Sequence, residues 1–298
     1  MSGVEVKAGR LTASLRESLA VSPRRGTVNL FWLGQAGFAL RTADGLAVID
    51  PYLSDALAEK YQGAHFKHTR MMPPPVGADE LRGVDLLLAT HAHSDHLDPG
   101  SVGKIMEHNP GCRLACPAGV VPTALERGAD RDRTVGMRVM ERRRFGPFTV
   151  ELLPSAHEEL KVDENGDTAY GGFIIEAEGV KIYHSGDCVP FAGLAAMVKE
   201  RGVDVALLPV NGRDAERRAR GVPGNFTLDE AALLCLEAGV SHLLPHHFGM
   251  FDFNTVAPEA IRTGLEKYAA RGLRWSLPDV GSCFSVAAAR PAGASEAG

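Results

Sequence analysis

The chain has 298 residues, of which 45% are apolar, so it can bury the core of one large or two small globular domains. Its formal net charge of −5 argues against a protein that binds nucleic acid by neutralising phosphates. It contains no apolar run long enough to span a membrane.

The cysteines and the amino-terminal residues bear on where the protein works. The five cysteines are odd in number and lie mostly in apolar contexts, so we expect reduced thiols. Residues 1–20 mix charged and apolar side chains and lack the continuous apolar stretch of a secretion signal. We therefore expect a cytoplasmic protein.

Hydrophobic periodicity predicts a strand-rich first half and a second half in which strands and helices alternate. Residues 1–27 are expected to form a helical N-terminal arm, and residues 28–290 a single domain. The predicted strands are 28–33, 38–41, 46–49, 86–89, 148–153, 171–176, 180–183, 205–209, 242–244 and 282–286. The predicted helices are 117–127, 191–201, 227–238 and 258–270. This pattern predicts an α+β fold with two sheets packed face to face and helices outside.

The most informative stretch, residues 90–98, follows directly on the apolar strand 86–89. In an extended segment side chains two residues apart point the same way, so His91 and His93 converge. The chain then turns, and Asp95 and His96 can face a neighbouring point. Burying three imidazoles and a carboxylate is costly, and a divalent cation offsets that cost. The stretch therefore predicts a metal site for zinc, manganese or iron.

Further candidate ligands stand at the ends of later predicted strands. His157 follows strand 148–153, Asp187 follows strand 180–183, and His246 and His247 follow strand 242–244. Loops at one end of a sheet bring together residues from distant parts of the sequence. We therefore expect these side chains to meet those of residues 91–96.

The motif His-x-His-x-Asp-His at residues 91–96, with the later His, Asp and His, resembles the metallo-β-lactamase superfamily. The resemblance implies an αββα sandwich of two mixed sheets that holds two divalent metal ions. The ligands that it implies for the first metal are His91, His93 and His157. Those for the second metal are Asp95, His96 and His247, with Asp187 as the bridging carboxylate. His247 is preferred to His246 because the family spaces this histidine two residues after the proline.

Four further segments are similar to the L-ascorbate-6-phosphate lactonase-like group of that superfamily. They are WLGQAGF at 32–38, DPYLSD at 50–55, YHSGD at 183–187 and LPVNGR at 208–213. The likeness runs from about residue 28 to residue 254. His157 departs from the group, whose third motif is poor in histidine, so the substrate is expected to differ.

Two cations about 3.5–4 Å apart can share a hydroxide and lower the pKa of its parent water toward roughly 7. The resemblance thus implies hydrolysis by a metal-bridging hydroxide, with Asp95 and Asp187 in the catalytic centre. His246, beside a ligand, is a candidate proton donor to the leaving group. Cys188 could instead act as a covalent nucleophile, but no base that would activate its thiol is identified. Asp98 and Ser185 could orient ligand imidazoles or could serve only as cap and turn residues.

Four residues are candidates for substrate binding: Arg70, Tyr170, Asn211 and Arg213. We expect a lactonase or ester hydrolase acting on a small polar substrate that carries a phosphate in some cases. The alternatives are a phosphodiesterase acting on a nucleotide or phospholipid, and a metal-binding protein without catalysis. We expect neither nucleic acid nor membrane as a partner, and the sequence leaves a homo-oligomer open.

Overall fold

The computed structural model describes residues 3–289 and contains two large mixed sheets. The first sheet has the order β1 (Val4–Arg10), β17 (Ser282–Ala288), β2 (Thr27–Gly34), β3 (Gly37–Arg41), β4 (Leu46–Ile49), β5 (Leu86–Leu88), β6 (Arg113–Pro117) and β7 (Thr134–Met137). The second has the order β16 (Arg274–Trp275), β15 (His242–His246), β14 (Val205–Pro209), β13 (Val180–His184), β12 (Gly171–Ala177), β9 (Phe148–Pro154) and β8 (Arg142–Phe145). A small hairpin of β10 (Ala156–His157) and β11 (Glu159–Leu160) stands apart from both.

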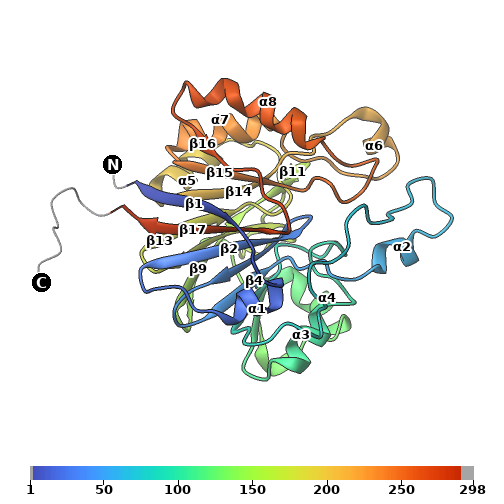
Figure 1. Cartoon of the computed structure of the whole chain (residues 1–298). Coiled ribbons are helices and arrows are strands. Elements are labelled where there is room, and N and C mark those ends of the chain that lie inside the picture. The colour runs from blue at the N-terminus through green and yellow to red at the C-terminus, as the bar shows by residue number, and fades with distance from the viewer. Residues whose placement is uncertain (1–2, 290–298) are drawn as a thin grey trace, which may run out of the picture.

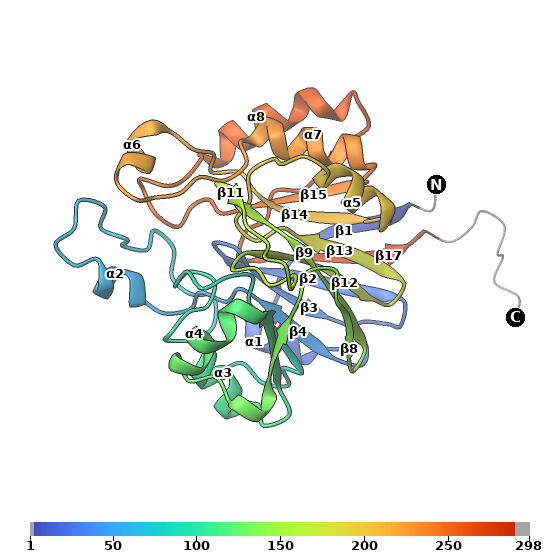
Figure 2. The same cartoon turned by 180° about the vertical axis from the view of Figure 1, so that it is seen from behind.

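Helices cover the outer faces of the two sheets (Figures 1 and 2). On the first sheet lie α1 (Leu15–Ala20), α3 (Val102–His108) and α4 (Val121–Glu126). On the second lie α5 (Leu194–Glu200), α7 (Leu228–Ala238) and α8 (Pro258–Ala269). The short helices α2 (Ala56–Lys60) and α6 (Ala215–Ala219) project together on one side of the molecule. The predicted αββα sandwich is confirmed. No helix of the described residues has the length and apolar character needed to cross a membrane.

Strand β2 explains why the first sheet holds two layers of apolar side chains. Leu30 and Trp32 pack into the cluster between the sheets, and Phe31 and Leu33 pack under the outer helices. A strand covered on both faces reads as a continuous apolar run, which is what residues 28–33 show. The parallel strands β4–β7 and β13–β16 then bring several loops to the same edges of the sheets.

The N-terminal segment differs from the expected helical arm. Residues Val4–Arg10 form an edge strand that pairs antiparallel with β17, and within residues 3–27 only the six residues of α1 are helical. Val4, Val6 and Ala8 alternate with Glu5, Lys7 and Gly9, which is the two-residue period of a strand that the predicted helical arm overlooked, although only Val4 is buried. The predicted end of the domain at residue 290 lies outside the described residues.

Two predicted helices are shorter than expected. Pro117 closes strand β6, a single 3-10 turn follows, and α4 begins only at Val121. The predicted helix 191–201 begins at Leu194, after Gly193 with a φ of 90°. The capping box at the start of α7 is present, with Thr227 accepting from the Glu230 backbone and Glu230 accepting from that of Thr227.

Candidate metal centre

The loop after β5 is folded back on itself so that its side chains face one point. The backbone N–H of Leu97 donates to the His93 carbonyl at 2.9 Å, which closes a turn around Asp95. Arg127 from the end of α4 donates to the carbonyls of Ala92 at 2.7 Å and Leu97. One guanidinium therefore fixes both ends of the segment that carries the predicted ligands.

The seven predicted ligands form two adjacent groups. In each group one ligand atom per residue lies within 4.8 Å of the others. The first group is His91, His93, His157 and Asp187, and the second is Asp95, His96 and His247. His246 belongs to neither group.

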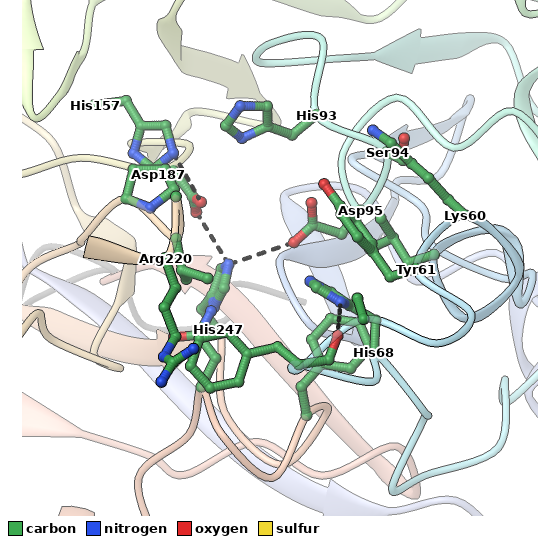
Figure 3. A pocket seen from close by; sticks show the side chains of 18 of the residues that line it. Lys60, Tyr61, His68, His93, Ser94, Asp95, His157, Asp187, Arg220 and His247 are labelled. Atoms are coloured by element: carbon green, nitrogen blue, oxygen red, sulfur yellow. Dashed lines mark hydrogen bonds and ion pairs between the residues drawn. The ribbon is translucent and has the colours of Figure 1, made fainter. Parts of the chain in front are cut away.

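Asp187 lies between the two groups (Figure 3). Its Oδ1 is 3.3 Å from His96 Nε2 and 3.3 Å from His247 Nε2. Its Oδ2 is 3.7 Å from His157 Nε2 in the other group. Asp95 Oδ2 is 3.6 Å from His247 Nε2. One carboxylate thus offers an oxygen to each group, as a bridging ligand requires.

The chemistry of these atoms fits divalent cations. Four of the candidate ligand atoms are buried and have no hydrogen-bond partner among the described residues. They are Nε2 of His91, His96 and His157 and Oδ1 of Asp187. Unpaired buried polar atoms are costly, and here they converge instead of lying scattered. Imidazole and carboxylate are the ligands that zinc, manganese and iron share. The residues present therefore fit divalent metal ions.

The histidines and aspartates of the two groups shift one another's pKa values. Burial lowers the pKa of His91 well below its usual value and that of His157 to about 4. Burial opposes the charging of His247, but the Asp187 and Asp95 carboxylates raise its pKa to about 9. Likewise burial opposes ionisation of Asp187, yet the imidazoles of His247 and His96 hold its pKa well below the usual range. A bound cation would take the place of these protons, so binding a metal should release protons.

The sequence interpretation missed the groups that orient these ligands. Asp50 Oδ2 accepts from His96 Nδ1 at 2.7 Å and from the Thr90 hydroxyl at 2.6 Å, and Thr90 Oγ1 is 3.0 Å from His91 Nδ1. Gln35 Nε2 donates to Asp95 Oδ2 at 2.9 Å. Such contacts fix which ring nitrogen faces a metal. By contrast, Asp98 accepts from the backbone of Leu53 and Ser54, and Ser185 donates to the Gly186 carbonyl.

Left-handed backbone conformations gather at the same place. Gln35, Asp50 and His247 have φ values of 50°, 46° and 62°, which are uncommon outside glycine. At Gly186 (φ 61°) a Cβ would lie 2.8 Å from both the Gly171 carbonyl oxygen and Thr90 Cβ. A glycine is required there because the Asp187 loop passes so close to its neighbours. Strain concentrated in this way is typical of functional sites.

The centre forms the floor of a cavity of about 290 Å³ (Figure 3). Five of the seven predicted ligands border this cavity, namely His93, Asp95, His157, Asp187 and His247. The remaining walls come from the segment around α2, the residues after α6, and the loop after β15. Their side chains include Leu57, Lys60, Tyr61, His65, Phe66, His68, Arg220, Val222, Pro223, Phe251 and Asn254.

None of the four predicted substrate residues borders this cavity. Arg70 donates to the carbonyls of Tyr52, Ser54 and Met72, and Arg213 is paired with Glu230 at 2.6 Å. Asn211 is buried and donates to Asn254 Oδ1. Tyr170 packs its ring against His91, His93 and His157, with centroids 5.3–6.0 Å apart. A single sequence could not distinguish these structural contacts from substrate contacts.

His246 and Cys188 also do not border the cavity. The His246 ring stacks on His184 with centroids 4.7 Å apart, and it does not border the cavity. It is therefore not placed to protonate a leaving group, which corrects the prediction. Cys188 is fully buried, and burial raises the pKa of its thiol to about 11.

Comparison with known proteins agrees with this architecture. The model of the β-lactamase superfamily domain matches residues 47–248, which include the seven residues of the two groups. A UPF0173 metal-dependent hydrolase of Aeropyrum pernix is 29% identical over 253 residues, covering 80% of this chain and 89% of that protein. Igni18, a metallo hydrolase of Ignicoccus hospitalis, has 21% identity and a TM-score of 0.62, covering 87% of this chain and 98% of that one. A possible metal-dependent hydrolase of Veillonella parvula has 14% identity and a TM-score of 0.68, covering 87% and 99%. The two structures show the fold, and the domain match shows the family: the chain belongs to the metallo-β-lactamase superfamily.

Proposed function

We propose that the protein is a metal-dependent hydrolase that cleaves an ester or lactone bond in a small molecule. The observation that carries the proposal is the pair of ligand groups joined by Asp187 at the floor of a cavity. The metal-dependent hydrolase named among its relatives supports the same reaction class.

In this proposal His91, His93, His157 and Asp187 would hold one ion, and Asp95, His96, His247 and Asp187 the other. Zinc or manganese suits this ligand set, and iron is compatible with it. When bound, the ions supply a nucleophile from water near neutral pH and polarise the scissile carbonyl.

The histidine His68 on the cavity wall supplies a hydrogen-bonding group close to the candidate ligands. His68 lines the cavity, and its Nδ1 lies 3.0 Å from the Phe66 carbonyl oxygen. A carbonyl can only accept, so Nδ1 carries the proton and Nε2 is a free acceptor in the neutral ring. Burial lowers the pKa of His68, which favours that neutral form. His68 can therefore accept a hydrogen bond from the attacking water or from a donor on the substrate.

A phosphodiesterase is the second candidate, because two cationic side chains, Lys60 and Arg220, border the same cavity. Both reactions use the same metals, so the bond that is cleaved has to be measured directly. A panel of lactones, aryl esters and phosphodiesters would be assayed with protein loaded with zinc or with manganese.

The test variant is Asp187→Asn, which keeps the size of the side chain and removes the shared charge. We expect one metal ion to be lost or weakened and activity to fall by several orders of magnitude. Cys188→Ser is the matched control and should retain both metals and most activity. If Cys188→Ser abolished turnover with both ions still bound, a covalent mechanism would replace this one.

A further inference from the structure

The cavity is chemically divided between its floor and its mouth. Both carboxylates that border it, Asp95 and Asp187, lie at the floor with the ligand imidazoles. The cations that border it apart from histidine, Lys60 and Arg220, are exposed and come from the two projecting segments around α2 and α6. From this division we infer that the substrate has a flat aromatic body and an anionic group at the end distant from the bond that is cleaved. The inference takes only the type of reaction from the proposed function, and the recognition of the anionic group is argued separately.

Aromatic rings with fixed orientations form part of the wall between the floor and the mouth. Phe66 is stacked on Phe253 with centroids 4.4 Å apart and an interplanar angle of 13°. Tyr61 is stacked on His68 at 4.2 Å and 21°. Phe66, Tyr61 and His68 all border the cavity, while a neighbouring ring supports each of them. Rings that are already ordered can stack on a planar ligand without losing side-chain freedom.

Lys60 is available to bind an anion. Its ammonium lies 5.2 Å from the centroid of Tyr61. The lysines of residues 3–289 that pair with a carboxylate are Lys7, Lys161 and Lys267, and Lys60 is not among them. A cation at the rim of an aromatic surface without an acidic partner is a suitable receptor for a carboxylate or phosphate.

Arg220 offers a second contact from the other side of the cavity (Figure 3). Its guanidinium lies 5.8 Å from the centroid of Phe66, so it also stands beside the aromatic wall. Its acidic partner, Glu216, is 3.6 Å away and 71% exposed, which makes this a weak, screened pair. Arg213, in contrast, is held by two contacts of 2.6 Å to Glu230 and is not free for a ligand.

The test compares three probes that share the scissile acetyl ester and the aromatic ring. 4-Acetoxybenzoate has a distal carboxylate, 4-acetoxyphenylphosphonate has a phosphonate in the same place, and 4-acetoxybenzamide is neutral there and carries no second ester bond. Wild-type protein loaded with zinc should show a kcat/KM for either anionic probe at least about tenfold above that for the neutral one. Lys60→Gln with Arg220→Gln should abolish this preference, so that kcat/KM for the anionic probes falls to the value that the same variant shows for the neutral probe. Arg262→Gln, an exposed arginine on α8, is the control and should keep the preference.

A preference for only one of the two anions would identify the group that the mouth recognises. A wild-type preference near one, or a preference that survives in the double variant, would overturn the inference while the hydrolase stands. Calorimetric binding of benzene-1,4-dicarboxylate gives a readout without turnover. If no probe were cleaved but the dicarboxylate bound wild type about tenfold more tightly than the double variant, the proposed reaction would fail and the recognition would hold.

Discussion

Asp50 orients the His96 ring in the candidate metal centre. Its carboxylate is fully buried and accepts from His96 Nδ1 and from both the amide and the hydroxyl of Thr90. His96 therefore turns Nε2 toward Asp187, 3.3 Å away. The same carboxylate, acting through Thr90, reaches the imidazole of His91.

We expect Asp50→Asn to weaken metal affinity about 10- to 100-fold, because the amide no longer favours the imidazole tautomer with Nε2 free. Competition with a chromophoric chelator measures this directly. Asp44→Asn, which alters an exposed pair with Arg25, is the control. Unchanged affinity in Asp50→Asn would show that Asp50 serves only to hold the loop of Thr90.

The role assigned to His68 can be separated from its packing. Phenylalanine at this position retains the stacking on Tyr61 and the edge contacts with Phe251 and Phe253. It removes the acceptor nitrogen, so His68→Phe should lower kcat/KM about 100-fold with the metal content unaltered. An equal loss of metal, or full activity, would contradict a direct role for His68.

At the scale of elements, the strand ends were predictable and the loops between them were not. The candidate ligands follow strands that read as apolar runs. The placement of residues 91–96, 157, 187 and 247 could therefore be anticipated from the sequence. The short helices α2 and α6 beside the cavity carry no periodic apolar pattern, whereas edge strand β1 has an alternation at Val4, Val6 and Ala8 that the predicted helical arm overlooked. The substrate candidates Arg70, Tyr170, Asn211 and Arg213 were chosen for their side-chain chemistry, whereas the cavity is bordered by segments that only tertiary packing brings there. The orienting role of Asp50 likewise depends on a contact across 46 residues.

Strand β15 begins with a histidine that links stability to pH. His242 is buried beside Ser276, and burial lowers its pKa to about 4. The folded pKa lies below the ordinary value near 6.5, so the unfolded chain takes up the proton first. Its contribution to stability is complete above about pH 6.5 and is lost as the pH falls toward 4, at about 1.4 kcal/mol per pH unit at most.

We therefore expect the difference in unfolding free energy between wild type and His242→Gln to shrink from pH 7 to pH 5. Urea unfolding of both proteins at each pH measures it, and the comparison cancels the titration of other histidines. A difference that does not vary with pH would show that His242 titrates normally in the folded protein.

At the scale of the whole molecule, the candidate metal centre draws its residues from both sheets. His91, His93, Asp95 and His96 follow β5 of the first sheet, whereas His157, Asp187 and His247 follow strands of the second or the hairpin beside it. Ions held by both sets would tie one half of the sandwich to the other.

Three expectations about the whole molecule stay predictions from the sequence. They are that it does not bind nucleic acid, that it can form a homo-oligomer, and that it is cytoplasmic.

Removing the metals should therefore destabilise the entire fold. An ion present at about 100 times its Kd contributes about 2.7 kcal/mol, and 1 kcal/mol shifts the Tm of a chain of 150–250 residues by about 2–4 °C. Because the shift per kcal/mol falls as a chain lengthens, loss of one such ion from this chain of 298 residues should lower the Tm by about 5 °C. Calorimetry before and after chelation, with zinc added back as the control, measures the shift. An unchanged Tm would mean that the ions do not join the sheets.

The central claim is that seven side chains hold two ions with Asp187 between them. Anomalous diffraction from crystals grown with zinc tests it most directly. The account predicts two peaks about 3.5–4 Å apart, with ligand atoms at about 2.0–2.2 Å and Asp187 in contact with both. A single ion, or two ions that leave His157 or Asp187 uncoordinated, would contradict it.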